Sequence, residues 1–204
     1  MSKFIAGVML IAVAAILPLH LPQTQKEEKY QQLTIQTEEV YRRDSILEDN
    51  AGGPSIQEPI TLVRTIDGDT IKVKIKGINE TVRYLLVDTP ESKKEGMCVQ
   101  PFAMEAFQRN KQLVTSGRLT LEFEPGNTRD SYGRLLAYVY VDGQSVQETL
   151  LKEGFARVAY IMNPEYKSLA SYREDEGLAK RSRLNIWSHS DYVTKWGFNG
   201  CVQK

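Results

Sequence analysis

Histidine and cysteine are scarce in this chain of 204 residues, which has two of each. His20 lies near one end and His189 near the other, so mechanisms that need a histidine pair or a Ser-His-Asp arrangement are disfavoured. Two cysteines supply too few ligands for a zinc site. The 26 basic and 26 acidic residues leave no net charge, which argues against a strongly cationic protein that binds nucleic acid tightly and statically.

The longest apolar run is at the start of the chain. It extends from Phe4 to Leu17 and follows Lys3, a pattern typical of a secretory signal or a short membrane anchor. We predict that residues 1–21 direct export, as a cleaved signal or, in the reading we favour, as an uncleaved anchor. Residues 22–59 are rich in Gln, Glu, Lys, Thr and Ser. They offer too little apolar surface to offset the entropy of ordering, so a disordered linker is expected.

A folded domain is expected over residues 60–190, because the pattern becomes strand-like after Pro59. β-branched residues predict strands at Thr61–Ile66, Ile71–Ile75, Thr81–Val87, Leu119–Phe123 and Leu135–Val141. Apolar spacing predicts helices over 102–114, 146–153 and 165–182. This order predicts an α+β fold, a five-stranded β-barrel of the OB type with about three packed helices.

Two carboxylates flank a glycine in Asp67-Gly68-Asp69-Thr70. Glycine permits a tight turn, so hard oxygen ligands could approach one cation there. Asp-Gly is also an ordinary hairpin signal, and for this tetrapeptide alone the turn is the simpler interpretation.

Arg83 lies inside an apolar strand that ends in two acids, Asp88 and Glu91. A buried arginine needs an anionic partner, and a purely structural pair with Asp88 or Glu91 would satisfy it. Arg83 and Asp88 differ by an odd number, so in a regular strand they would point to opposite faces. A bulge or a strand end is therefore expected between them.

A third polar cluster, Arg129-Asp130-Ser131-Tyr132-Gly133-Arg134, lies between two predicted strands. Guanidinium groups match phosphate oxygens and stay charged at any working pH, although a solvated hairpin loop would have the same composition. Together the three clusters provide a cation site, a candidate base and arginines, which are the groups that phosphoryl transfer requires.

The three clusters and the segment Leu184-Asn185-Ile186-Trp187-Ser188 resemble the staphylococcal nuclease (thermonuclease) family in order and spacing. The resemblance covers about residues 61–190 and is strongest to exported nucleases of Bacillus. It implies an OB-fold barrel with Ca²⁺ in the cleft. By residue match, Asp69 and Asp88 would supply calcium carboxylates, Thr89 a backbone carbonyl ligand, and Glu91 would orient or deprotonate the attacking water.

The same resemblance implies that Arg83 and Arg134 bind the scissile phosphate and offset its growing charge. It further implies that DNA and RNA are substrates and that products carry 3′-phosphate and 5′-hydroxyl ends. Tyr132 and Tyr160 match positions near the bound nucleotide, although ordinary packing would also explain them. Ser131 stands where relatives often have lysine and Met162 where an aromatic residue is common, so phosphate affinity and base preference are expected to differ.

Cys98 precedes the first helix of the domain and Cys201 lies in the C-terminal extension, residues 191–204. In an exported chain an even cysteine count favours a disulfide, which would tether the extension to the domain. Two reduced, unrelated thiols are the alternative.

The main alternative function is an OB barrel that holds single-stranded nucleic acid or a peptide without cutting it. The presence of Asp69, Glu91 and both arginines favours the nuclease. We therefore expect a calcium-dependent nuclease outside the cytoplasm, either secreted or associated with the membrane through residues 1–21. No obligate protein partner is implied, and a monomer is expected.

Overall fold

The computed structural model describes residues 24–25, 27–29, 31–32, 34–36, 58–92, 96, 98–126 and 128–202. The described residues between Thr24 and Gln36 are helical, and the first strand begins at Glu58, near the end of the predicted linker. The predicted signal or anchor, residues 1–21, lies outside the described residues. Within the described part of the chain, no helix is long and apolar enough to cross a membrane.

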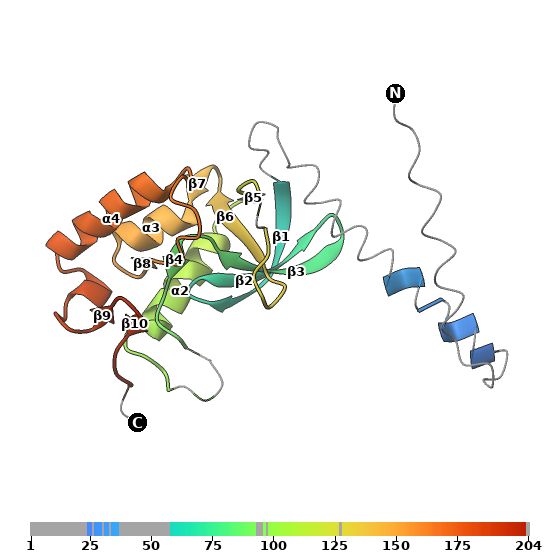
Figure 1. Ribbon diagram of the computed structural model, residues 1–204, viewed down its shortest axis with the longest axis horizontal. Coiled ribbons are helices and arrows are strands. Elements are labelled where there is room, and N and C mark those ends of the chain that lie inside the picture. Colours follow the sequence, from blue (N-terminus) through green and yellow to red (C-terminus); the bar gives the residue numbers. More distant parts are fainter. Residues whose placement is uncertain are drawn as a thin grey trace. The chain divides into compact units, whose positions relative to one another are not determined.

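Ten strands and three α-helices follow Glu58 in the described residues (Figure 1). The strands are β1 Glu58–Asp67, β2 Thr70–Ile75, β3 Ile78–Tyr84, β4 Val87–Asp88, β5 Leu119–Glu122, β6 Leu135–Val141, β7 Gln144–Ser145, β8 Arg157–Val158, β9 Val193–Thr194 and β10 Gly197–Phe198. The helices are α2 Ala103–Val114, α3 Val146–Lys152 and α4 Leu169–Arg181, followed by the 3-10 turn η2 Asn185–Trp187.

Five of these strands close into a barrel. The antiparallel order β3-β2-β1-β5-β6 is completed by a parallel pairing of β3 with β6, in which Val82 lies opposite Leu135. Closure leaves no unpaired edge among the five strands. The predicted five-stranded OB barrel is confirmed.

The barrel core comes from alternating residues, as the period of a strand requires. In β2, Ile71, Val73 and Ile75 are fully buried. Helix α2 buries Ala103, Ala106, Asn110 and Val114, which share one face at helical spacing. Helix α3 begins after Ser145, which is its N-cap. The Ser145 hydroxyl accepts a hydrogen bond from the Glu148 amide at 3.2 Å.

Several predicted bounds were wrong. Strands β1 and β3 begin earlier than predicted, at Glu58 and Ile78, and two further bounds differ for a clear physical reason. The strand predicted at Thr81–Val87 ends at Tyr84, because the chain turns at Leu85–Leu86 and Leu86 adopts a φ of 67°. The helix predicted over 165–182 begins only at Leu169. Asn163 causes part of this delay, since its side chain accepts a hydrogen bond from the Glu165 amide and holds a turn there.

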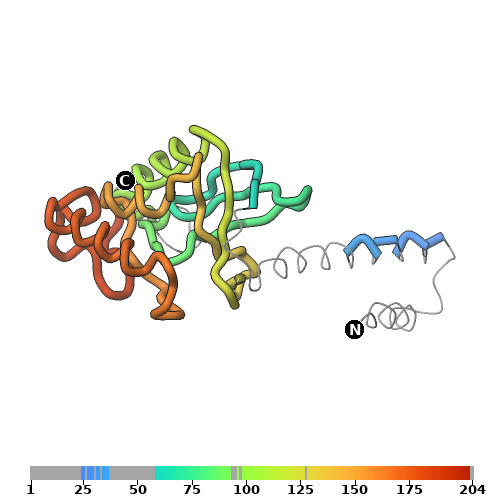
Figure 2. Tube along the Cα trace, turned by 90° about the horizontal axis from the view of Figure 1, so that it is seen from above, coloured from blue at the N-terminus to red at the C-terminus, as the bar shows by residue number. Residues whose placement is uncertain are grey.

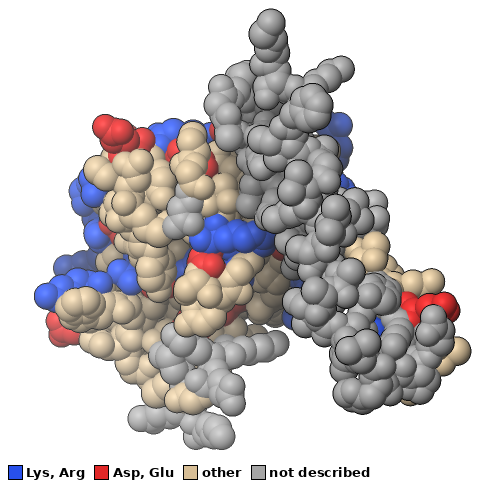
Figure 3. Space-filling view, turned by 45° about the vertical axis from the view of Figure 1, so that its right-hand side comes forward, with Lys and Arg blue, Asp and Glu red and all other residues tan. Residues whose placement is uncertain are grey.

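The C-terminal extension forms a hairpin of β9 and β10 that packs beside the start of α2 (Figures 1 and 2). The Tyr192 ring contacts Phe102 with centroids 5.6 Å apart, and the Tyr192 hydroxyl donates to the Pro101 carbonyl. On the face shown in Figure 3, basic and acidic side chains are interspersed, in keeping with the even charge balance of the chain.

Candidate active site

The Asp-Gly-Asp turn joins β1 to β2 and lies against Thr89. Oδ2 of Asp69 accepts hydrogen bonds from the Thr89 amide and from the Thr89 hydroxyl, each at 2.9 Å. A Cβ atom at Gly68 would lie 2.5 Å from the Thr89 hydroxyl oxygen. Gly68 is therefore needed for close approach of two chain segments as well as for the turn.

Arg83 is held between two acids. Its Nη1 lies 3.2 Å from Oδ2 of Asp69, and its Nη2 lies 3.2 Å from Oδ1 of Asp88. Nη1 also donates to the Val87 carbonyl at 2.8 Å. Burial opposes the positive charge, but Asp69 and Asp88 outweigh it and raise the pKa of Arg83. The guanidinium is thus fixed in place and stays charged.

Asp88 has a second arginine as a partner. Its Oδ2 accepts hydrogen bonds from Nε of Arg157 at 3.0 Å and pairs with Nη2 of Arg157 at 2.9 Å. The Tyr160 hydroxyl lies 3.5 Å from Oδ1 of Asp88, and the Arg83 guanidinium lies 5.3 Å from the Tyr160 ring centroid. Burial and the charge of Asp69 raise the pKa of Asp88 despite both arginines.

Asp67 and Glu91 add further negative charge. Burial, followed by the charges of Asp69 and Glu91, raises the pKa of Asp67 to about 7. The Ser92 hydroxyl donates to Asp67 at 3.1 Å, and the Asn110 side chain donates to the Asp67 carbonyl at 2.7 Å. Near neutral pH the Asp67 carboxyl is therefore partly protonated, because burial and the neighbouring acids disfavour its charge.

Arg134 comes from the loop before β6. Its Nε pairs with Asp130 at 2.6 Å, and its guanidinium lies 5.4 Å from the Tyr132 ring centroid. The Arg134 side chain is 33% exposed, whereas that of Arg83 is 10% exposed. Tyr132 is 83% exposed and Tyr160 is 63% exposed, so neither ring serves the core. Each ring lies beside an arginine and keeps most of its surface open to solvent.

These groups surround one open cleft with a volume of about 660 Å³. Its lining includes the predicted site residues Asp69, Arg83, Glu91, Tyr132, Arg134 and Tyr160. Asp67, Ser131 and Met162 line it as well. Asp88 and Thr89 are buried and are absent from the lining, but both contact Asp69 or Arg83, which line the cleft. The structure therefore brings all eight of these predicted residues to one place, six at the cleft wall and two directly behind it.

The oxygen ligands that Asp69, Asp88 and Thr89 offer suit a hard divalent cation. Carboxylate oxygens are the ligands that calcium prefers. Burial, followed by repulsion from Asp69, raises the pKa of both Asp67 and Asp88. A cation would relieve that repulsion. The described residues contain no ready group of three or more His, Cys, Asp or Glu ligands. Asp69 and Asp88, with the Thr89 carbonyl, would thus need oxygens of water or substrate to complete the shell.

Sequence reasoning missed two residues at the site. Arg157 lies in an apolar stretch, Phe155-Ala156-Arg157-Val158-Ala159, which is the same signal that identified Arg83. Gln100 binds the backbone of Glu91 through its side-chain oxygen at 2.8 Å. No local pattern marks Gln100, because its second partner, the Phe198 carbonyl, is 98 positions away.

Residues 81–189 match the family model described as staphylococcal nuclease homologue, which is more than half of the chain. This protein belongs to the staphylococcal nuclease family. The family membership that the sequence motifs predicted is confirmed. The matched region contains Arg83, Asp88, Glu91 and Arg134.

Among the relatives of this family member is a protein named Endonuclease YncB from Bacillus subtilis (strain 168). It is 64% identical over 144 residues, which cover 71% of this chain and 68% of the relative. The SPbeta prophage-derived endonuclease YokF of the same organism is 61% identical over 145 residues, 71% of this chain but 49% of its own length. Thermonuclease from Staphylococcus hyicus is 36% identical over 133 residues, 65% of this chain and 78% of that protein.

Proposed function

We propose that this protein cleaves DNA and RNA in a calcium-dependent reaction, outside the cytoplasm, and leaves 3′-phosphate and 5′-hydroxyl ends. As a member of the staphylococcal nuclease family, with relatives named endonuclease and thermonuclease, the chain is a nuclease, a hydrolase of phosphodiester bonds. The proposal concerns the metal, the range of substrates, the product ends and the location.

One observation carries the proposal: a single cleft lined by Asp69, Glu91, Arg83 and Arg134. A cleft of about 660 Å³ admits a nucleotide, and the two exposed tyrosines offer aromatic faces on which any base can stack. Stacking of this kind tolerates every base, which suits an enzyme without strict sequence preference.

Three side chains would carry out the hydrolysis. Glu91 accepts a proton from the attacking water, which is the role of a general base. The water oxygen bonds to phosphorus as the bond from phosphorus to the 5′ oxygen breaks, and the departing 5′ oxygen takes up a proton from solvent. Arg134, the more exposed arginine, contacts the phosphoryl oxygens where negative charge grows. Arg83, fixed by Asp69 and Asp88, adds a second positive charge to the cleft wall. Because these groups are held before substrate arrives, little reorganisation is needed during the reaction.

Asp69, Asp88 and the Thr89 carbonyl would hold the calcium ion, which polarises the phosphoryl group when it is bound. The excess of acids over arginines near Asp67 is the structural support for a cation at this position. Calcium binding should therefore lower the pKa of Asp67, because the ion favours ionised carboxylates nearby.

Two features support a location outside the cytoplasm. The apolar run Phe4–Leu17 resembles an export segment, and Cys98 and Cys201 are joined as a disulfide with Cα atoms 5.6 Å apart. Disulfides persist mainly in oxidising compartments. Fractionation of cells that express the full chain tests the location: nuclease activity confined to the cytoplasm would contradict it.

The first test is digestion of single-stranded DNA and of RNA by the purified full-length protein, with calcium and with chelator. We expect cleavage only with calcium, and fragments that a polymerase extends only after phosphatase treatment. The Glu91→Gln variant is the control for contaminating nuclease, and it should lower kcat by about 10²- to 10⁴-fold.

Each other outcome removes a defined part of the proposal. Cleavage that survives chelation would discard the metal, and fragments extended without phosphatase would discard the proposed ends. Binding without cleavage at any calcium concentration would favour the OB barrel that only holds single strands.

A further inference from the structure

The C-terminal hairpin is joined to the domain close to Glu91. The disulfide links Cys98 to Cys201, and the Val202 amide donates to the Val99 carbonyl at 2.8 Å. The hairpin is held internally as well, since Tyr192 and Phe198 contact one another with ring centroids 5.6 Å apart. These contacts hold the last described residues against the segment that precedes α2.

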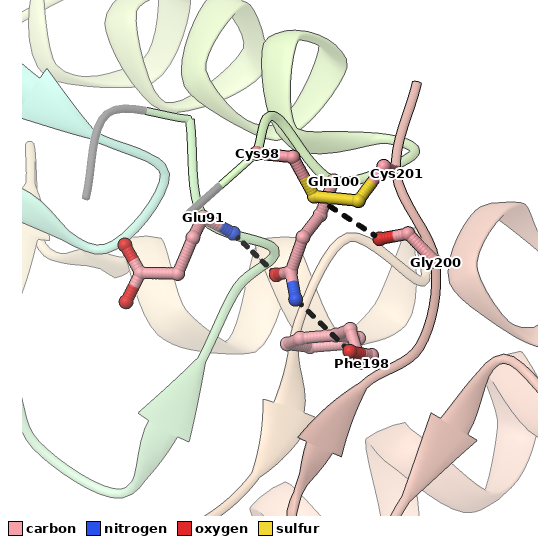
Figure 4. Close-up of a disulfide and its surroundings, with 6 residues drawn as sticks. All are labelled: Glu91, Cys98, Gln100, Phe198, Gly200 and Cys201. Carbon is pink, nitrogen blue, oxygen red and sulfur yellow. Dashed lines mark hydrogen bonds between the residues drawn. A yellow bond between two sulfur atoms is a disulfide. The ribbon is translucent and has the colours of Figure 1, made fainter. Parts of the chain in front are cut away.

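Gln100 connects this hairpin to Glu91 (Figure 4). Its side-chain Oε1 accepts a hydrogen bond from the Glu91 backbone amide at 2.8 Å. Its backbone amide donates to the Glu91 carbonyl at 3.1 Å. Its Nε2 donates to the Phe198 carbonyl at 2.9 Å. Gln100 is only 6% exposed, so water competes little for these bonds. Both backbone groups of Glu91 are thus held by one residue, which is itself held by the hairpin.

Phe198 also contacts the site through Arg157. The Arg157 guanidinium lies 5.7 Å from the centroid of the Phe198 ring, and Arg157 in turn pairs with Asp88 at 2.9 Å. The hairpin therefore contacts partners of both Glu91 and Asp88.

Glu91 depends on such contacts because it lies in irregular backbone. Strand β4 ends at Asp88 and helix α2 begins only at Ala103, so no ladder or helix fixes the peptide at Glu91. Sites on loops are held less accurately than sites on regular elements unless neighbouring groups support them.

We propose that Gln100 is a positioning residue for Glu91, and that the C-terminal hairpin and the Cys98–Cys201 disulfide hold Gln100 in place. This inference rests on the proposed role of Glu91 in hydrolysis. Loss of the Gln100 contacts shifts the Glu91 carboxylate relative to the phosphate, so kcat falls. The affinity for substrate, which the arginines and tyrosines provide, is kept.

The test compares two variants of the full-length protein with a matched control. Gln100→Leu removes both side-chain hydrogen bonds, and the double variant Cys98→Ser with Cys201→Ser removes the covalent link between the hairpin and the segment before α2. Gln147→Leu is the control, because Gln147 is another buried glutamine that bridges two backbone groups, the Val139 amide at 3.0 Å and the Ala137 carbonyl at 3.1 Å.

Turnover is measured well below the unfolding temperature of every variant. We expect kcat to fall about 10- to 100-fold in Gln100→Leu, with KM within about twofold of the wild-type value. The cysteine double variant should show a fall of the same kind, and reduction of the wild-type protein should reproduce it. Gln147→Leu should lower the unfolding temperature but leave kcat unchanged.

The Glu91→Gln background separates positioning from a general loss of structure. If Gln100 acts through Glu91, Gln100→Leu should cause little further loss of kcat in that background, because coupled residues are not additive. A full additional loss there, an equal loss of kcat in Gln147→Leu, or unchanged kcat in Gln100→Leu and the cysteine double variant would each overturn the proposal.

A second measurement does not depend on catalysis. Hydrogen exchange of the Glu91 amide, followed by NMR in chelator, should speed up in Gln100→Leu because that amide loses its acceptor. An unchanged exchange rate would overturn the proposal that Gln100 holds the Glu91 backbone. A wild-type protein without activity would contradict the proposed function instead, and the exchange experiment would still test the contact.

Discussion

Nη2 of Arg83 lies 3.2 Å from Oδ1 of Asp88, although five positions separate the two residues in the sequence. In a regular strand they would point to opposite faces. The chain turns between them at Leu85–Leu86, where Leu86 adopts a φ of 67°, and so Asp88 turns back toward Arg83. This turn joins an arginine of the barrel wall to an acid of the next segment.

The two cleft arginines should differ in what they contribute. Arg83→Met leaves Asp69 and Asp88 buried without this partner, so the free energy of unfolding in chelator should fall by about 3–5 kcal/mol. Arg134→Met removes a partly exposed pair with Asp130, which should cost at most about 1 kcal/mol. Its kcat should nevertheless fall about 10²- to 10³-fold.

Urea unfolding and steady-state kinetics on the two variants check this contrast. Equal losses of stability would show that Arg134 is as much a structural residue as Arg83. Unchanged kcat in Arg134→Met would remove its assigned role.

Arg157 should be essential for the integrity of the site although it does not line the cleft. Arg157→Met deprives Asp88 of two close contacts at 3.0 and 2.9 Å, so we expect a loss of about 3 kcal/mol in unfolding free energy. Arg118→Met is the matched control, because Arg118 is 96% exposed and its contact with Asp142 is 3.7 Å long. Similar urea midpoints for the two variants would contradict this role for Arg157.

Gly68→Ala should damage both stability and turnover. The added Cβ would lie 2.5 Å from the Thr89 hydroxyl oxygen and 3.0 Å from the Ala106 Cβ, so the Asp69–Thr89 contact must open. Gly177→Ala in helix α4 should instead be neutral or stabilising by about 0.5–1 kcal/mol, because alanine favours the helix and its Cβ meets only a flexible arginine end. Thermal unfolding and kcat of both variants test the difference.

The stability of the protein without calcium should depend on the protonation of Asp67. Its pKa is about 7 in the folded protein and 3.8 in the unfolded chain, so between these values the folded state binds the additional proton. Stability is therefore greater near pH 5 and falls as the pH rises through 7. Asp67→Asn should flatten this dependence, which urea unfolding in chelator at several pH values would measure. A slope unchanged by the substitution would assign it to other groups.

Local patterns identified much of this protein in advance. The β-branched runs of β2 and β6 and the helical spacing of α2 predicted a barrel with packed helices, because burial of one face has a fixed period in each element. The strand predicted at Thr81–Val87 was wrong at its C-terminal end, because β3 ends at Tyr84. Leu85, Leu86 and Val87 are all buried, and an apolar run carries no mark of where the backbone turns.

The sequence by itself determined the barrel, the family and the acids and arginines of the cleft, since strand period, turn glycines and charged residues in apolar strands are local signals. Only the tertiary structure decided how these groups meet: Arg83 between Asp69 and Asp88, Arg157 behind Asp88, and Gln100 between Glu91 and Phe198. The physical reason is that such contacts join residues up to 98 positions apart. They form when the barrel closes and the C-terminal hairpin packs onto it, and no local preference of the chain encodes them.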